Sequence, residues 1–419
     1  MNVTSVKRIH QSDWTDAGIR FIRARDIVAK SKNEKITEPL FISEEKYKEY
    51  SALSGKVKIG DLLVTGVGTI GVPMLIDSEE PLYFKDGNVI WFKNENKIDG
   101  HFFYYSFIGT TIQNYIKETS GSGTVGTYTI DSGKKTPIPL PKDRDEQIRI
   151  GQFFFDLDNL VTLHQRKLES IKLLKKSLLQ KMFPKNGESV PEVRFPGFTD
   201  AWEQRKLESL CIKFTDGDWI EAKDQSDSGV RLVQTGNVGV TEYLDKPNNK
   251  KWISEETFNR LHCEEVLPGD ILISRLPEPA GRACIMPALE TKMITAVDCT
   301  IVRTAPEINN KFLVQYLSSQ SYFKEVNTCL AGGTRQRISR SNLANFDIPV
   351  PTDKAEQDAI GEFLDNLDNL ITLHQRAPND AQSRLPIQTG GAIFTKQGYC
   401  LLSSGFNSLR ISSLNSLLI

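Results

Sequence analysis

Forked hydrogen-bond donors gather in one short stretch of the chain, 331-AGGTRQRISRSN-342. Its two glycines leave the backbone free to turn, and its arginine and glutamine side chains offer paired donors. Guanidinium groups fit guanine edges and phosphates, whereas carboxamides fit adenine edges. We therefore predict that this stretch contacts nucleic acid, with a solvated polar loop as the alternative interpretation. The candidate residues are Arg335, Gln336, Arg337 and Arg340.

An equivalent stretch earlier in the chain, 121-GSGTVGTYTIDSGKK-135, carries hydroxyl and ammonium groups. It is less basic, but such groups also bond to phosphates and bases. Nucleic-acid contact and a purely structural loop are equally open here. The candidate residues are Thr124, Thr127, Tyr128, Lys134 and Lys135.

Two further groups of candidates follow a shared G-x-R signal, in GIRFIRARDI (18–27) and GVRLVQTGNV (229–238). Contact with DNA and a strand end exposed to water are both open interpretations. The candidate residues are Arg23, Arg25, Gln234, Thr235 and Asn237. Arg275 and Arg282 flank LPEPAG, for which a proline-rich turn is the preferred interpretation.

The sequence shows no familiar catalytic motif. It lacks the Asn-Pro-Pro-aromatic motif of methyltransferases, the G-x(4)-GK-[ST] loop, H-E-x-x-H and G-x-S-x-G. Its six cysteines form no C-x-x-C pair, which favours reduced thiols over a zinc site or a disulfide frame. We predict a chain that is not an enzyme by itself and holds no metal.

Composition limits the remaining classes. The 419 residues carry a net charge of −1, so nucleic-acid binding has to rely on local basic patches. The length favours two domains. No long uncharged apolar run or signal peptide is present, which predicts an intracellular, cytoplasmic protein that does not enter a membrane.

A duplication organises the chain. Residues 145–166 and 355–376 share 14 of 22 positions without a gap, ending in DNLVTLHQR and DNLITLHQR. Upstream, TPIPLP (136–141) corresponds to FDIPVP (346–351), and the similarity fades farther back while keeping its register. Each copy therefore has one nearly fixed segment and one that has diverged, and each serves as the other's homologue.

The nearly fixed segment has the pattern of a long helix. It runs about 39 residues from Asp145 to Phe183, or roughly 57 Å. Apolar residues recur every seven positions, and a second series is broken by Lys175. Histidine on such a seam is more commonly a packing residue than a ligand. We predict that the two helices pair antiparallel, with His164 near His374. The predicted interface residues are Ile150, Leu157, His164, Ile171, Leu178, Leu367 and His374.

The diverged segments alternate short β-rich runs with short helices, as in GDLLVTGVGTIGVPMLI and KFLVQYLSSQSYFKEV. The predicted fold class is α+β: two mixed α/β domains in tandem repeat, joined by long helices that pair as an antiparallel coiled coil. The predicted boundaries are 1–143 (first domain, short at its N-terminus), 144–184 (first helix), 185–201 (linker), 202–353 (second domain), 354–376 (second helix, truncated) and 377–419 (divergent tail).

From about residue 18 to 376 the chain resembles specificity subunits of type I restriction-modification enzymes. The resemblance is carried by the two-copy plan, the IP-x-P-x(4)-EQ-x(2)-IG lead-in to each helix, the DNL-[VI]-TLHQR core and VPEVRFPGFTDAWEQRKL. It implies two target recognition domains that bind the two halves of a split sequence in double-stranded DNA. It also implies paired helices that dock two modification subunits, with restriction subunits joining the complex. The partner subunits would supply the S-adenosylmethionine, ATP and Mg²⁺ chemistry.

The chain departs from that pattern at both ends. The strand expected before the first domain is missing, and after Arg376 the sequence diverges, with Pro378 expected to stop the helix. The loss would expose Ile150, Phe153 and neighbouring apolar residues. The alternatives are an inactive truncated specificity subunit, a coiled-coil adaptor that binds only proteins, and a single-chain nuclease or methyltransferase with unrecognised motifs.

Overall fold

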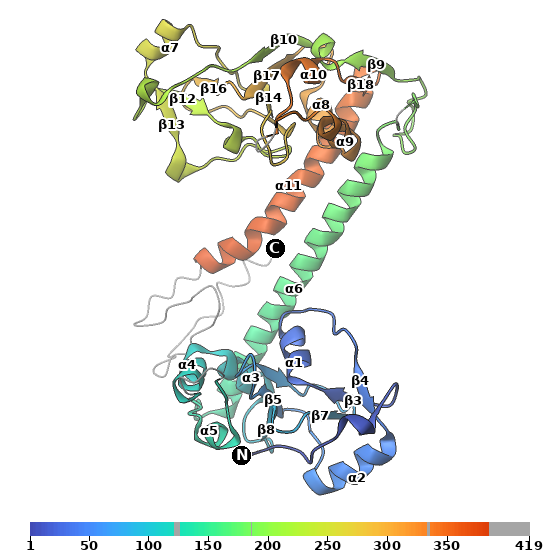
Figure 1. Ribbon diagram of the computed structural model, residues 1–419, viewed down its shortest axis with the longest axis vertical. Helices are drawn as coiled ribbons and strands as arrows, with labels where there is room; N and C mark the ends of the chain where they lie inside the picture. Colours follow the sequence, from blue (N-terminus) through green and yellow to red (C-terminus); the bar gives the residue numbers. More distant parts are fainter. Residues whose placement is uncertain (121–125, 186, 333–335, 385–419) are drawn as a thin grey trace. The chain divides into compact units, whose positions relative to one another are not determined.

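The computed structural model describes the backbone of residues 1–120, 126–185, 187–332 and 336–384, with side chains up to Gln375 (Figure 1). The chain divides into two compact units. Unit 1 contains Met1–Leu163 and unit 2 contains His164–Ser383. Helix α6 (Arg144–Lys181) therefore gives its first turns to unit 1 and the rest to unit 2.

Unit 1 is built on two four-stranded sheets with orders β1-β8-β5-β6 and β2-β4-β3-β7. All neighbours are antiparallel except β3 and β7. The strands are β1 (Asn2–Thr4), β2 (Trp14–Thr15), β3 (Ile19–Ile22), β4 (Leu40–Ile42), β5 (Leu62–Thr65), β6 (Pro73–Leu75), β7 (Leu82–Phe84) and β8 (Val89–Lys93). The helices before α6 are α1 (Ala24–Ser31), α2 (Glu44–Ser54), α3 (Gly100–Ile108), α4 (Thr110–Thr119) and α5 (Ile130–Lys135).

Unit 2 repeats this plan. Its sheets have the orders β10-β17-β14-β15 and β11-β13-β12-β16, again with one parallel pair, β12 and β16. The strands are β9 (Glu203–Lys206), β10 (Cys211–Asp216), β11 (Gln225–Ser226), β12 (Val230–Val233), β13 (Lys251–Ile253), β14 (Ile271–Ser274), β15 (Ala283–Ile285), β16 (Met293–Thr295), β17 (Cys299–Thr304) and β18 (Asp347–Val350). The helices are α7 (Glu255–Leu261), α8 (Asn310–Tyr316), α9 (Gln320–Thr328), α10 (Arg340–Ala344) and α11 (Lys354–Arg384). The matching strand orders confirm the predicted duplication and the α+β class.

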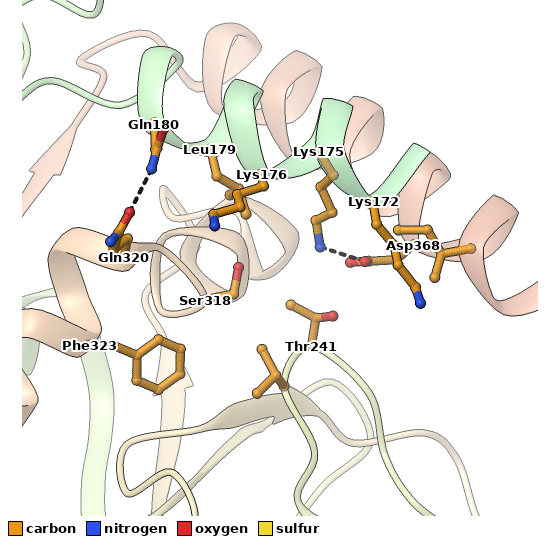
Figure 2. Close-up of a pocket in the computed structure, with 12 residues that line it drawn as sticks. Lys172, Lys175, Lys176, Leu179, Gln180, Thr241, Ser318, Gln320, Phe323 and Asp368 are labelled. Carbon is orange, nitrogen blue, oxygen red and sulfur yellow. Dashed lines mark hydrogen bonds and ion pairs between the residues drawn. The ribbon is translucent and has the colours of Figure 1, made fainter. Parts of the chain in front are cut away.

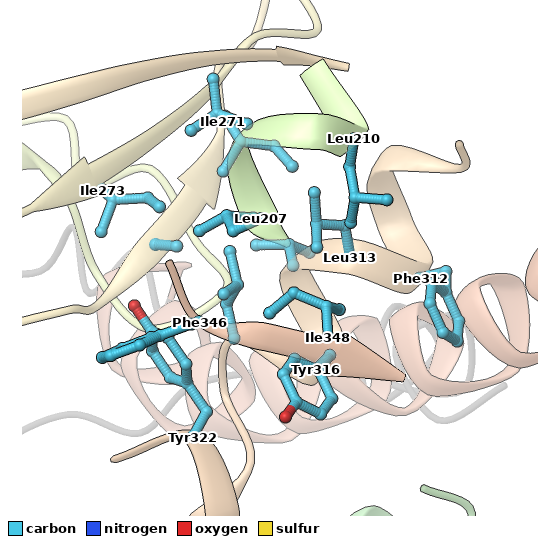
Figure 3. Close-up of a cluster of buried hydrophobic side chains, with 14 of the residues drawn as sticks. Leu207, Leu210, Ile271, Ile273, Phe312, Leu313, Tyr316, Tyr322, Phe346 and Ile348 are labelled. Carbon is cyan, nitrogen blue, oxygen red and sulfur yellow. The ribbon is translucent and has the colours of Figure 1, made fainter. Parts of the chain in front are cut away.

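The main core of unit 2 joins its sheet to its helices (Figure 3). Ile271 and Ile273 of β14 pack with Phe312 of α8 and Tyr322 of α9, and Ile360 brings in the start of α11. All five side chains are almost fully buried. Because the first turns of the long helix belong to this core, the domain fixes the direction in which α11 leaves it.

The EQ-x(2)-IG motif is the joint between each domain and its long helix. In unit 1, Gln147 accepts a hydrogen bond from the backbone N–H of Asp99, the residue that caps α3, over 3.2 Å. In unit 2, Gln357 accepts the same bond from Asn309, which caps α8, over 3.0 Å. Both glutamines also donate to the carbonyl of a preceding proline at 3.1 Å. A buried amide thus orients the helix in each copy.

The glycine of the same motif allows close approach. A Cβ on Gly151 would lie 2.6 Å from the backbone N of Phe102, and one on Gly361 would lie 2.7 Å from the N of Phe312. Contacts this short with main-chain atoms cannot be relieved by a rotamer change. The near identity of the two copies at this motif therefore has a packing cause, separate from any partner.

In unit 2, α6 and α11 run antiparallel. His164 faces His374, with 3.1 Å between their Nδ1 atoms, and Lys175 bonds to Asp368 at 2.5 Å. From His164 to Lys175 along α6, the contacted residue on α11 moves back from His374 to Asp368, so the two helices are antiparallel. This confirms the predicted direction and the predicted histidine pair. Ile171 and Leu178 pack against the core cluster that contains Leu367, as expected of seam residues. Lys175, which interrupted the apolar series, is buried because its ammonium group has this carboxylate partner.

Two expectations about the helices were wrong. Ile150 packs against the core of unit 1 and not on a seam between helices, because the first turn of α6 docks on its own domain. Helix α11 continues past Pro378 to Arg384. A proline removes its own N–H bond and crowds one carbonyl, so it can kink a helix without ending it. Leu157 is half-buried, and its place in an interface stays a prediction. No helix in the described ranges is both long and apolar enough to cross a membrane.

Composition predicted a linker at 185–201, but the segment before β9 packs on unit 2. Trp202 is 3% exposed and stacks edge-on against Phe183, and Phe195 meets Phe363 with ring centroids 5.7 Å apart. Arg194 forms two hydrogen bonds to the buried carboxylate of Glu356 at 2.6 and 2.8 Å. The segment is therefore a structural part of the second domain.

The described residues of unit 1 contain no strand that corresponds to β9. In unit 2, β9 pairs with β18, where Val350 is 3% exposed. The corresponding described segment of unit 1, residues 136–141, forms no strand, and Leu140 is 46% exposed. Phe153 is also exposed, as expected, whereas Ile150 is half-buried. This leaves an uncovered apolar surface on unit 1.

The histidine pair makes the helix contact sensitive to acid. Partial burial, and then Lys167 and His164, lower the pKa of His374 below its ordinary value. As the pH falls below about 6.5, His374 is protonated more readily in the unfolded chain than in the folded chain. The free energy of unfolding that is present above that pH is therefore lost on acidification. We expect the thermal midpoint of the chain to fall between pH 8 and pH 5 by more than that of His374→Gln. His10→Gln, at an exposed position in unit 1, should behave as wild type. Parallel pH profiles for wild type and His374→Gln would contradict this.

Candidate functional site

The arginine-rich loop of unit 2 is anchored at both sides of its tip. Ala331 and Arg337 exchange two backbone hydrogen bonds of 3.0 and 2.9 Å. Ile338 is fully buried and its N–H donates to the carbonyl of Arg275. Ser339 then caps α10 by accepting from the N–H of Asn342. The predicted residue Arg335 lies outside the described residues.

Three of the residues predicted to contact DNA are exposed to solvent on this anchored loop. Gln336 is exposed, and the side chains of Arg337 and Arg340 are 61% and 45% exposed. Arg337 lies 3.7 Å from Asp298, and Arg340 lies 3.8 Å from Asp216. These distances are long for ion pairs, so both guanidinium groups keep donors free for another partner.

Arg275 has a structural place behind this loop. Its side chain is 8% exposed, lies 3.4 Å from Asp216 and donates to the carbonyl of Val297. Arg282 is likewise buried and donates to the carbonyls of Thr235, Val238, Leu276 and Pro279. Burial lowers the pKa of Arg282. Both arginines hold loops together, which agrees with the preference for a structural turn at LPEPAG.

Of the unit 2 candidates that follow the G-x-R signal, one is buried and two are half-buried. Asn237 is 3% exposed; its carboxamide accepts from the N–H of Gln234 and donates to Leu244. We therefore withdraw Asn237 as a DNA contact, because its polar atoms are used inside the loop. Gln234 and Thr235 are half-buried at the start of the same turn and stay predictions.

In unit 1, fewer of the predicted DNA contacts are exposed and free of structural bonds. Arg23 bonds to both carboxylate oxygens of Asp26 at 3.0 Å and to the carbonyl of Glu38, which gives it a structural role. Arg25 is exposed beside Glu38. Tyr128 is 2% exposed, bonds to Thr136 at 2.5 Å, and burial raises its pKa to about 12.

Tyr128 is therefore a core residue, and the prediction that it contacts DNA was wrong. Tyr128 lies between two threonines, and these neighbours do not indicate whether its side chain points into the core or into solvent. Thr127 is exposed, as are Lys134 and Lys135 in the last turn of α5. These three stay predictions, and Thr124 lies outside the described residues.

Several features of unit 2 have no signal in the sequence. Asp216 and Asp298 are the nearest acidic groups to the two exposed arginines, at 3.8 and 3.7 Å, and the spacing of these residues along the chain does not indicate it. Trp219 follows Asp216 by three residues and is 72% exposed, unusual for so large an aromatic side chain. In the described part of the chain no three metal-ligating side chains come together. The exposed donors of Arg337, Arg340 and Gln336 can bind phosphates and base edges.

A groove lies between α6 and the domain of unit 2 (Figure 2). It has a volume of about 530 Å³ and is lined by Lys172, Lys175, Lys176, Leu179, Gln180, Val240, Thr241, Ser318, Gln320, Phe323, Asp368 and Ile371. The lysines come from one face of α6, since positions three and four apart are neighbours on a helix. No motif marked this groove in the sequence.

Comparison with known proteins gives a consistent result. Residues 9–173 and 199–382 both match the family model described as type I restriction modification DNA specificity domain. The type I restriction enzyme MjaVIII specificity subunit of Methanocaldococcus jannaschii is 24% identical over 251 residues, covering 57% of each chain. The putative MjaX specificity subunit of the same organism is 24% identical over 353 residues, covering 79% of this chain and 77% of that protein. The match thus spans little more than half the length of the first relative.

One solved structure shares the fold. The type I restriction-modification system S subunit from M. genitalium aligns with a TM-score of 0.54 and 12% identity, over 91% of this chain and 90% of that one. At this identity the likeness concerns the fold alone, and it agrees with the two α+β units described above.

Proposed function

Because the chain belongs to the type I restriction modification DNA specificity domain family, with two such domains in tandem, we propose that it reads a bipartite DNA sequence. Each domain binds one half of the target. The observation that carries this proposal is the pair Arg337 and Arg340, exposed on a loop whose neighbour Ile338 is buried. Forked donors held on a rigid base are suited to base edges in a major groove.

The paired helices serve, in this proposal, to dock modification subunits. In unit 2 they expose apolar side chains that packing inside the unit does not use: Leu173 and Leu174 on α6, and Leu370 and Leu373 on α11, with exposures between 43% and 69%. Exposed leucines on neighbouring helices are typical of a protein interface. Two modification subunits bind there, and restriction subunits join through them.

In this proposal, the catalytic reactions are carried out by the modification and restriction subunits. S-adenosylmethionine, ATP and Mg²⁺ are used by the modification and restriction subunits, and this chain decides where on the DNA they act. The complex works in the bacterial cytoplasm, where its DNA substrate lies.

A mobility-shift experiment tests the proposal. The chain, together with a modification subunit of the same restriction-modification system, is mixed with a random DNA pool, and retained duplexes are sequenced across a salt series. We expect retention of one split sequence and a steep fall of affinity with salt. Binding without sequence preference would contradict the proposal. Methylation of DNA by the chain alone would contradict its non-catalytic role.

A further inference from the structure

The groove beside α6 carries a surplus of positive charge. Its lining contains three lysines and one carboxylate, Asp368. That carboxylate is already satisfied, since Lys175 bonds to it at 2.5 Å and Gln315 donates to it at 2.8 Å. Lys172 pairs only with the exposed Glu169 on its own helix, and Lys176 is exposed without an ion pair to any described residue. Two ammonium groups are therefore available to an anion.

Polar groups of the domain complete the groove. Figure 2 shows Thr241 and Ser318 facing the same space as the lysines, while Gln180 and Gln320 bond to each other at 2.6 Å across it. The Ser318 hydroxyl already donates to the carbonyl of Gln315 at 2.7 Å. The hydroxyl of Thr241 and the lysine ammonium groups are the donors that a phosphate oxygen can use. The apolar side chains in the lining can support the lysine stems.

One loop joins the groove to the predicted DNA contacts Gln234 and Thr235. The turn that begins with Gln234 runs on to Val240 and Thr241 at the groove. Arg282 ties that turn to the domain through Val238, and the N–H of Thr241 donates to the carbonyl of Ala283 at 2.8 Å.

Thr241 has φ +66°, a left-handed conformation that β-branched residues rarely adopt. Backbone strain of this kind persists only where surrounding bonds enforce it. The loop tip is thus held in a fixed shape against the lysines of α6.

We propose that this groove binds the sugar-phosphate backbone of duplex DNA next to the half-site read by unit 2. The inference rests on the proposed function and adds a contact from the long helix. Because the lysines come from α6 and the hydroxyl of Thr241 comes from the loop that follows β12, the site exists only when these two parts of unit 2 pack together. Helix packing therefore controls part of the DNA affinity.

The test compares Lys172→Gln/Lys176→Gln with a matched control, Lys181→Gln/Lys185→Gln. The control lysines lie outside the groove lining and share the carboxylate of Glu192. Affinity for the target duplex is measured across a salt series with the assembled complex. The groove variant should show a slope of log affinity against log salt that is shallower by about 2, at roughly 0.9 per lost phosphate contact. Its preference for target over non-target DNA, and its thermal midpoint, should not change.

Several outcomes would overturn the inference. One is a wild-type slope in the groove variant while wild type itself remains sequence-selective, which leaves the proposed function intact. A second is an equal loss in the control variant. A third is failure of the groove variant to assemble with the modification subunit in size-exclusion chromatography, which would make the groove a protein contact. If wild type shows no sequence selectivity, the proposed function and the inference both fail.

Discussion

Replacing Arg194 by alanine is expected to lower the free energy of unfolding of unit 2 by about 3–5 kcal/mol. Arg194 holds the carboxylate of Glu356 through two short bonds and also donates to the carbonyl of Asp200. Glu356 is 1% exposed, so the substitution strands a charge that water cannot reach. The loss is measured by denaturant unfolding followed through the buried indole of Trp202.

A compensating variant separates this mechanism from simple loss of packing. In Arg194→Met/Glu356→Leu both charges are absent, and stability should return to near the wild-type value, because apolar pairs of similar volume often replace buried ion pairs without cost. Lys185→Ala, at an exposed position, is the control and should change stability by less than about 0.5 kcal/mol. Equal destabilisation in the single and double variants would contradict the stranded-charge explanation.

The prediction also bears on the asymmetry between the copies. Glu146 occupies the position of Glu356 in unit 1 but is only half-buried. The charge therefore keeps access to water, and Glu146→Ala should cost far less than Glu356→Ala. The same sequence motif thus has different energetic weight in the two units, because Arg194 pairs with the buried Glu356, whereas Glu146 is half-buried.

The duplication allowed much of this fold to be predicted. Heptad spacing gave the long helices, and the repeat of DNL-[VI]-TLHQR gave the antiparallel contact of His164 with His374. The joint at Gln357 and Gly361 could not be predicted in the same way. Identity between copies marks such residues as constrained, but the partners Asn309 and Phe312 lie about 50 positions away and carry no signal.

The site was harder to predict because polar residues in loops serve two purposes. Arg337 and Asn237 both sit in glycine-containing polar stretches, yet one is exposed and the other closes its own turn. A polar side chain is buried when it bonds to a backbone carbonyl that the folded loop leaves unpaired, as Asn237 does with Leu244. Which carbonyls stay unpaired is decided by contacts between residues far apart in the sequence. For the same reason Tyr128, chosen for its hydroxyl, proved to be a core residue.

Replacing Arg337 and Arg340 by alanine is expected to remove most of the sequence selectivity attributed to unit 2. A bidentate arginine contact with a base contributes about 1–3 kcal/mol of discrimination. Loss of two such contacts therefore corresponds to about 2–6 kcal/mol, and selectivity should fall by roughly thirtyfold to 20,000-fold. Asp298 and Asp216 lie 3.7 and 3.8 Å from the guanidinium groups, too far for hydrogen bonds, so both arginines have donors free for a base.

Selectivity has to be measured half by half, because only the part of the target contacted by unit 2 should relax. Retained duplexes from a random pool are sequenced for wild type, Arg337→Ala/Arg340→Ala and the control Arg8→Ala. Arg8 is an exposed arginine of unit 1 whose acid partner, Asp86, keeps Lys85. The double variant should keep one half-site and lose bases in the other, if each domain binds its own half of the target as proposed. Uniform weakening without a change in the recovered sequence would show that these arginines contact phosphate, and the recognition role would then have to move to other exposed residues of unit 2, such as Gln336.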